Sequence, residues 1–186
     1  IVISEIMPGF GTGYSDEEFI ELYNSTAAAV DLSDYSLKRK SSATATSTQT
    51  LASSSVFSGK TIPVKGFLLV ASNEYQGQKT PDKRYSSQSY HLAYDDDAVV
   101  LYNGDNVVDE VAYTNIGEGQ SFERKSFSAG VCVSVLSGGE FLGNDCDTGN
   151  SVNDFEIRVI PNPQNSASLP EPRSAPSQIH NFNAVY

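Results

Sequence analysis

The carboxylates and amides between Asn144 and Asp154 are the side chains whose spacing comes nearest to a metal site. Oxygen ligands alternate with other residues here, and Gly149 permits the tight backbone turn that calcium loops need. Counted from Asp145, the twelfth residue is Glu156, but Gly149 takes the fifth position, where a calcium loop supplies a ligand. Two interpretations stay open, a structural Ca²⁺ site or a solvated turn. The predicted ligands are Asp145, Asp147, Asn150 and Asp154.

The two cysteines of the chain, Cys132 and Cys146, flank a segment that contains two consecutive glycines. Such a segment can turn the chain back on itself, so we expect a disulfide rather than two unpaired thiols. A disulfide persists in oxidising compartments, which predicts an extracellular or cell-surface location. The cysteines do not predict a zinc site, because His91 and His180 are distant in sequence and nothing nearer completes a ligand set.

The sequence lacks the residue patterns of the common catalytic sites. It contains no Gly-x-Ser-x-Gly elbow, no phosphate-binding loop followed by a helix, and no His-Glu-x-x-His pair. A pair of carboxylates for glycoside hydrolysis requires a known separation in space, which the sequence alone does not provide. We therefore predict that the domain is not an enzyme, and that a structural Ca²⁺ is the one cofactor to consider.

The charge balance narrows the class of partner. Asp and Glu number 23 against 12 Lys and Arg, so the formal net charge is -11. Clustered basic residues lead the attraction to nucleic acids, so this composition opposes nucleic-acid binding. The sequence contains no run of 18 apolar residues, the length that would predict a membrane span. The first residues are typical of a strand, and the absence of Met at position 1 indicates a mature or excised piece of a longer precursor.

Glu21 lies in the middle of a predicted strand, Glu18–Tyr23. In an extended strand Ile20 and Leu22 share one face, whereas Phe19, Glu21 and Tyr23 share the other. A carboxylate among aromatic side chains needs a partner, because an unpaired buried charge costs several kcal/mol. We predict a structural ion pair between Glu21 and Arg124, with Glu123 as the alternative partner of the arginine.

Short strands separated by Gly, Asn, Asp and Ser turns recur along the chain, and no segment has a helical period. This pattern predicts an all-β sandwich of one domain. The strongest local signal is a hairpin over 98–113, because Asn103–Asn106 tolerates positive φ. Further strands are predicted at Ile1–Ile6, Tyr35–Lys40, Thr61–Val64, Phe67–Ser72, Ser121–Ser126 and Val131–Leu136.

Two segments are predicted to lie outside the regular strands. Residues 41–55 are mostly Ser, Thr and Ala, which favours a long exposed loop over an edge strand. Prolines recur after Phe155 and predict an extended terminal segment, because proline lacks a backbone donor for a sheet. We therefore divide the chain into a sandwich at 1–163 and an extended proline-rich segment at 164–186, either part of the same domain or a linker.

Six short motifs occur in an order and spacing that resemble the lamin tail domain, over about residues 1–163. They are Glu17–Asn24, Asp31–Leu37, Gly66–Ala71, Asp95–Tyr102, Asn103–Tyr113 and Gly119–Arg124. The resemblance implies an immunoglobulin-like β-sandwich with long loops, a domain found in nuclear lamins and in many secreted bacterial proteins. It implies a fold more than a function, because unrelated activities occur on such sandwiches.

The leading functional hypothesis is a non-catalytic interaction or anchoring module of a secreted or surface protein, bacterial and monomeric, with a protein or glycan partner. One alternative is a carbohydrate-binding module stabilised by calcium, whose sugar platform would use Tyr85, Tyr90 and Tyr94. A second is an accessory domain of an extracellular hydrolase or nuclease, as the family resemblance implies. Association through an exposed edge strand is a third route to a partner.

Overall fold

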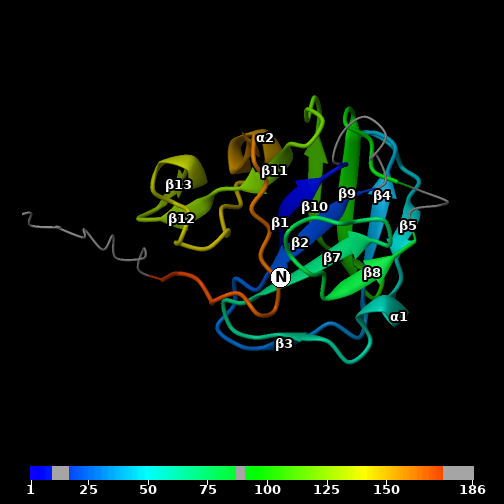
Figure 1. The fold of residues 1–186 in the computed structure, drawn as a ribbon, viewed down its shortest axis with the longest axis horizontal. Helices are drawn as coiled ribbons and strands as arrows, with labels where there is room; N and C mark the ends of the chain where they lie inside the picture. Colours follow the sequence, from blue (N-terminus) through cyan, green and yellow to red (C-terminus); the bar gives the residue numbers. More distant parts are fainter. Residues whose placement is uncertain (10–16, 87–90, 174–186) are drawn as a thin grey trace, which may run out of the picture.

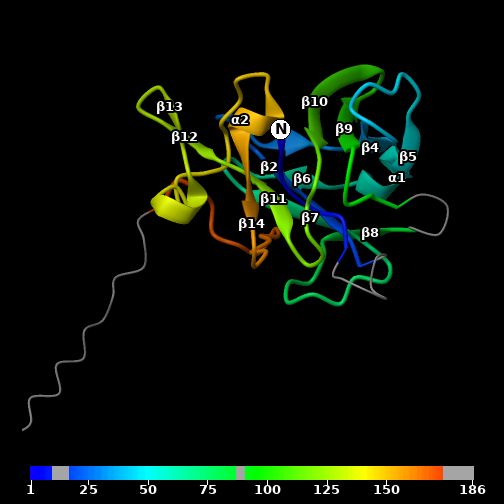
Figure 2. The same cartoon turned by 90° about the horizontal axis from the view of Figure 1, so that it is seen from above.

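The computed structural model describes residues 1–9, 17–86 and 91–173. Two β-sheets pack face to face, and their strands are joined by long loops (Figures 1 and 2). The main apolar core lies between the sheets, because its cluster contains Ile20 and Leu22 from one sheet together with Leu37 and Leu101 from the other. The predicted all-β sandwich is confirmed.

The larger sheet has six strands in the order β14-β11-β1-β2-β7-β8. Neighbouring strands are antiparallel except β7 and β8, which are parallel. The strands are β1 (Val2–Met7), β2 (Phe19–Tyr23), β7 (Phe67–Ser72), β8 (Lys83–Tyr85), β11 (Ser121–Arg124) and β14 (Phe155–Arg158).

The smaller sheet has four antiparallel strands in the order β10-β9-β4-β5. Its strands are β4 (Tyr35–Lys40), β5 (Gln49–Ala52), β9 (Asp97–Asn103) and β10 (Asn106–Tyr113). The predicted hairpin is confirmed as β9 and β10, which pair Asn103 with Asn106 across a turn. Gly104 has φ 58°, the left-handed backbone that such a turn needs.

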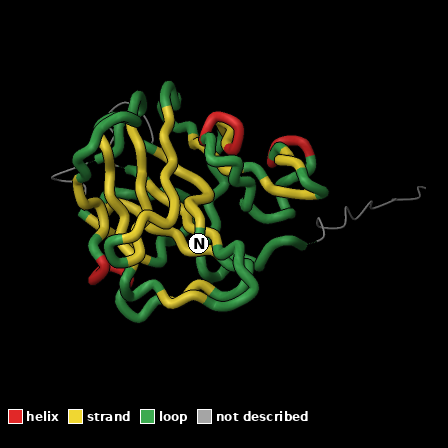
Figure 3. The backbone as a smooth tube through the Cα atoms, turned by 180° about the vertical axis from the view of Figure 1, so that it is seen from behind, coloured by secondary structure: helices red, strands yellow, loops and turns green. Residues whose placement is uncertain are grey.

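Short elements lie at the margins of the sandwich. Figure 3 shows the helices as single turns outside the strands, and Figure 1 shows the β12–β13 hairpin projecting beyond β11. These elements are β3 (Val30–Asp31), β6 (Thr61–Ile62), β12 (Ser126–Ser128), β13 (Val131–Val133), α1 (Ser54–Phe57), α2 (Ser151–Asp154) and the 3₁₀ turn η1 (Val135–Ser137).

The structure corrects the prediction for residues 41–55. This segment contains β5, an edge strand that pairs with β4, and it ends in α1. Leu51 and Ala52 are buried because β5 places them over the main core, although the surrounding Ser and Thr gave little apolar signal. Strands β8 and β14 were not predicted either, and the strand predicted at 131–136 ends at Val133, where η1 follows.

Both faces of the larger sheet are buried. Ile20 and Leu22 point into the main core, whereas Phe19 belongs to a second apolar cluster on the outer face, with Met7, Leu69, Ala71 and Tyr75. The predicted alternation along β2 is therefore confirmed. An outer face of this kind needs a cover, because exposed apolar surface costs about 25 cal/mol for each Å².

The C-terminal strap, residues 159–173, bonds to this outer face. The Tyr23 hydroxyl donates to the Glu171 carbonyl oxygen at 2.6 Å, and the Glu171 N–H donates to the Lys65 carbonyl oxygen at 2.9 Å. Residues 164–173 are thus bonded to the sheet, and residues 174–186 lie outside the described residues. The domain boundary at 163 stays a prediction.

Gly143 provides a test of how tightly the strap and the sheet fit together. Its φ is +90°, and a Cβ there would lie 2.4 Å from the Tyr23 hydroxyl oxygen. Gly149 has a similar φ of +75° but open space around it. We expect Gly149→Ala to cost about 1 kcal/mol through backbone strain, and Gly143→Ala to cost roughly 1–3 kcal/mol more through overpacking. Urea unfolding measures both, and equal losses would contradict the close fit.

Candidate functional site

Three glutamates lie side by side across the larger sheet. Glu5 on β1 pairs in register with Glu21 on β2 and with Glu123 on β11. Their side chains are 1%, 1% and 4% exposed, respectively. We call Glu5, Glu21 and Glu123 the acid row. Three carboxylates buried together are costly unless each receives hydrogen bonds or a proton.

A β-bulge places Glu5 in the acid row. The register of β1 against β2 shifts between Ile3 and Glu5. Ile3 and Ile6 both reach the main core, so the two polar residues between them, Ser4 and Glu5, face the outer side. The Ser4 hydroxyl then donates to Glu21 Oε1 at 2.6 Å.

Hydrogen bonds from the sheet and from the strap cover the acid row. Ser121 Oγ and the Asn162 N–H donate to Glu5 Oε1, the latter at 3.3 Å. The Gln164 N–H donates to Glu21 Oε2. Two alternate backbone amides of the strap therefore bond two neighbouring carboxylates, and this explains why the strap lies where it does.

Arg158 supplies positive charge at one end of the acid row. Its Nη1 lies 2.6 Å from Glu123 Oε2 and 2.7 Å from Glu140 Oε2, and its Nε donates to the Ile160 carbonyl oxygen at 3.0 Å. Asn162 Nδ2 donates to Glu140 Oε1 at 2.7 Å. The guanidinium thus joins the acid row to the start of the strap.

Burial is the main cause of the unusual titration of these groups. It raises the pKa of Glu5 from 4.5 to about 7, against hydrogen bonds from Ser121 and the charge of Arg158. Burial, and next the neighbouring Glu5, hold the pKa of Glu21 and of Glu123 well above the ordinary value. The acid row therefore retains protons close to neutral pH.

The geometry does not make the acid row a preformed metal site. Within the described part of the chain, one group of three ligating residues has its ligand atoms all within 4.8 Å of one another, and it is Cys132, Cys146 and Asp154. Glu5 Oε2 is buried without a hydrogen-bond partner. The raised pKa of Glu5 favours the protonated carboxyl group, which is neutral. A neutral group does not need a cation to balance its charge.

The predicted ion pair between Glu21 and Arg124 is wrong. Arg124 lies 2.5 Å from Asp109 through Nη2, and its other nitrogens donate to the carbonyl oxygens of Ile3 and Cys146, each at 2.7 Å. Arg124 is 2% exposed and its guanidinium stacks 4.5 Å from the Phe155 ring. The guanidinium therefore joins the two sheets, because Asp109 is on β10 and Ile3 is on β1.

The four predicted calcium ligands each have donors from the protein. Asp145 accepts from the Phe127 N–H at 3.0 Å, Asp147 from the Gly149 N–H at 3.1 Å, and Asn150 Oδ1 caps α2 through the Val152 N–H at 3.0 Å. Buried Asp154 accepts from Thr148 Oγ1 at 2.6 Å. The three carboxylates do not gather within 4.8 Å. The Ca²⁺ site stays a prediction that this geometry does not require.

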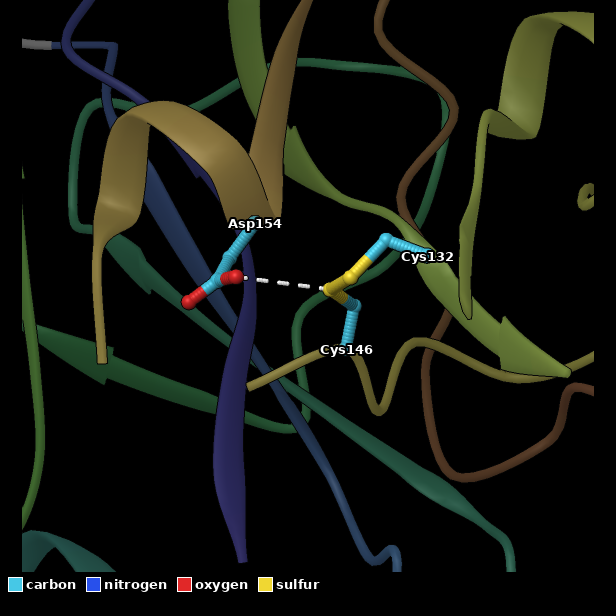
Figure 4. A group of neighbouring side chains, drawn as sticks. All are labelled: Cys132, Cys146 and Asp154. Carbon is cyan, nitrogen blue, oxygen red and sulfur yellow. Dashed lines mark hydrogen bonds between the residues drawn. A yellow bond between two sulfur atoms is a disulfide. The ribbon is translucent and has the colours of Figure 1, made fainter. Parts of the chain in front are cut away.

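The structure contains the disulfide between Cys132 and Cys146, with the Cα atoms 5.4 Å apart. It joins β13 to the loop that precedes α2, and Figure 4 shows Asp154 beside the bridge. Asp154 Oδ1 lies 3.4 Å from the Cys146 sulfur. Disulfide sulfurs are not free thiolates, so this group is not a metal centre.

The tyrosine platform considered for sugar binding is not formed as predicted. Tyr85 is 3% exposed in the main core, and its hydroxyl donates to Glu18 Oε1 at 2.9 Å. Tyr94 is half-buried, and Tyr90 lies outside the described residues. Stacking on a sugar needs an exposed ring face, which Tyr85 lacks.

The fold and the comparisons place the chain in a family. Two packed sheets around one main core define an immunoglobulin-like β-sandwich. Residues 1–115, more than half of the chain, match the Lamin Tail Domain family, and the chain belongs to that family. A comparison with curated protein sequences gave no match. The family match ends before β11, so the disulfide and the strap lie beyond it.

The described structure gives no support for insertion into a membrane through a helix. Across the described ranges, no helix has the length and apolarity needed to cross a bilayer.

Stability should fall as pH rises through neutrality. Glu5 has a folded pKa of about 7 against 4.5, so its contribution is fully present below pH 4.5 and is lost as pH rises through 7. We expect a loss of roughly 3 kcal/mol from this group between pH 4.5 and 8. Glu5→Gln should flatten that dependence, while the exposed control Asp105→Asn should keep it. Unfolding in urea across this pH range measures the slope, and unchanged slopes would refute the burial argument.

Reduction should destabilise the domain more than calcium removal. The disulfide closes a loop with a sequence separation of 14, so its loss should cost roughly 3 kcal/mol. Since the predicted calcium ligands already accept protein hydrogen bonds, we expect a chelator to leave the melting temperature unchanged. Thermal unfolding with and without reductant, calcium and chelator separates the two effects. A calcium-dependent rise abolished by Asp147→Asn would instead establish an ion site.

Proposed function

We propose that this domain is a non-catalytic interaction or anchoring module of a secreted or surface protein, in a bacterial extracellular setting. The family supports the general class, because the lamin tail domain is a non-enzymatic immunoglobulin-like domain. The compartment is supported by the disulfide, since such bonds persist where the surroundings are oxidising.

The observation that carries the proposal is the role of the acid row, whose glutamates have raised pKa values. In many enzymes, buried acids with a shifted pKa face a cleft and handle protons for a substrate. Here the acid row faces the strap, and strap amides occupy the carboxylates of Glu5 and Glu21. These carboxylates are buried and hydrogen-bonded to the strap, which supports a structural role for them.

The exposed surface supports contacts with another macromolecule. Large apolar side chains are exposed in three regions: β10 with α2, the β12–β13 hairpin with η1, and the strap. These exposed apolar groups are available for contact with a partner. The residues are Val107, Val108 and Val152, then Phe127, Val131 and Leu136, then Val159, Ile160 and Leu169.

Charge favours a protein partner over nucleic acid. The net charge of -11 repels phosphates, and six of the twelve basic residues form ion pairs with carboxylates within the described chain, as Arg39 does with Asp97 and Lys40 with Glu110. A carbohydrate-binding role loses its predicted platform with the burial of Tyr85. An accessory role beside a hydrolase or nuclease is a use of the same interaction module.

A photo-crosslinking scan tests this function. A benzophenone amino acid replaces Val108, Leu136 or Ile160, with exposed Asp105 as the matched polar control. We expect one apolar position to give a discrete crosslink in the extracellular fraction of the source cells, and binding to persist with the purified partner. We also expect no turnover of glycosides or phosphoesters. Turnover that one Asp or Glu substitution abolishes without unfolding would overturn the proposal.

A further inference from the structure

A cavity of about 240 Å³ opens on the outer face of the larger sheet, beside the strap. Its base is apolar and buried, formed by Met7, Phe19 and Tyr75, which are 1%, 0% and 3% exposed. Strap residues Val159–Pro163 form one wall, and residues 77–79 form the other. The volume is below that of a typical site for a drug-sized ligand and suits one large side chain.

The base of the cavity is shaped by aromatic packing and a glycine. Tyr75 meets Phe19 edge-on, with the ring centroids 5.7 Å apart and an interplanar angle of 79°. Gly77 lies so close to the Tyr75 ring that a Cβ there would be 2.2 Å from the hydroxyl oxygen. The backbone at Gly77 therefore packs directly against the Tyr75 ring and fixes its position. The cavity lies beside this ring.

The strap side of the cavity is apolar and exposed. Val159 and Ile160 are 70% and 75% exposed, although they immediately follow β14 and border a buried apolar base. Nothing in their own fold requires large apolar residues at such exposed positions. A partner side chain seated in the cavity would cover them, at a gain of about 25 cal/mol for each Å² removed from water.

Lys79 supplies the charge at this site. It is the one charged residue among the described residues lining the cavity, and its ammonium forms no ion pair within the described chain. An ammonium without an ion pair next to an apolar cavity favours a ligand group of negative charge at this position.

We propose that this cavity binds a partner polypeptide through one large apolar side chain that lies next to a carboxylate. The apolar group packs against Phe19 and Tyr75 and is covered by Ile160, while the carboxylate pairs with Lys79. The inference rests on the proposed function and assigns the partner's chemistry to one surface. The carboxylate is either a chain terminus or an acidic side chain, since both present the same group to the ammonium.

The simplest test uses three small probes in ¹⁵N-edited NMR titrations. N-acetyl-L-phenylalanine carries both features, its amide lacks the charge, and N-acetylglycine lacks the apolar group. We expect the first to shift the amides of residues 77–79, Val159, Ile160 and Asn162 with millimolar affinity. The amide should bind about 5-fold more weakly, as one partly exposed charge pair allows, and N-acetylglycine should not shift these amides at the same concentrations.

Two substitutions assign the two halves of the site. Lys79→Gln should abolish the preference for the acid over the amide, whereas Lys83→Gln, a half-buried lysine outside the cavity lining, should keep it. Ile160→Ser should weaken both ligands about equally. Ile160 is largely exposed, so this variant tests the cavity without a folding defect.

The outcomes separate this inference from the proposed function. Equal binding of all three probes, shifts confined to other surfaces, or discrimination that survives Lys79→Gln would overturn the cavity proposal. Crosslinking through Val108 or Leu136 together with silent probes would leave an interaction module with a different binding surface. Catalytic turnover would overturn the proposed function, while the titrations would still report on the cavity by themselves.

To extend the probes towards the natural ligand, a tripeptide ending in Glu-Phe is compared with its C-terminal amide. Loss of affinity on amidation would assign the terminal carboxylate as the partner of Lys79, and equal affinity would assign the acidic side chain. A tripeptide that binds more weakly than N-acetyl-L-phenylalanine would exclude a polypeptide ligand and so overturn the proposal.

Discussion

The burial of the acid row is the constraint on which the outer half of this domain depends. Three carboxylates on adjacent strands cannot all stay ionised when they are removed from water. Serine hydroxyls, strap amides and one guanidinium therefore bond to them, and protonation removes part of their charge. Removing the strap would expose the acid row and the Phe19 cluster together. The strap is therefore hydrogen-bonded to the outer face of the larger sheet, although its proline-rich sequence is also typical of a linker.

The surroundings of Glu21 and the β9–β10 hairpin could be predicted from the sequence. Alternation along β2 placed Glu21 among aromatic residues and required a partner for it, and the turn at Asn103–Asn106 defined the hairpin. The identity of the partner was not accessible. It depends on the bulge at Ser4 and on a strap amide about 140 residues away, neither of which has a local signal. The signal available for the acid row was a serine close to a glutamate in two strands, with Ser4 directly before Glu5 and Ser121 two residues before Glu123.

The remaining differences have the same origin in long-range packing. Gln49–Ala52 has weak strand propensity, yet pairing with β4 and cover from the main core make it a strand. The acidic loop before α2 contains the ligand types of a calcium site, but its oxygens serve as caps and turn acceptors, which composition cannot distinguish from coordination. The cavity beside Lys79 was not predicted, because its walls come from the two ends of the described chain and the loop after β7.

The contacts of Arg124 also define a route for mechanical load. A pull on the projecting hairpin passes through the covalent bridge to Cys146, whose carbonyl oxygen is held by Arg124. The same guanidinium donates a hydrogen bond to the Ile3 carbonyl oxygen on the larger sheet and forms an ion pair with Asp109 on the smaller one. A force applied at that end is therefore transmitted to strands of both sheets through one side chain.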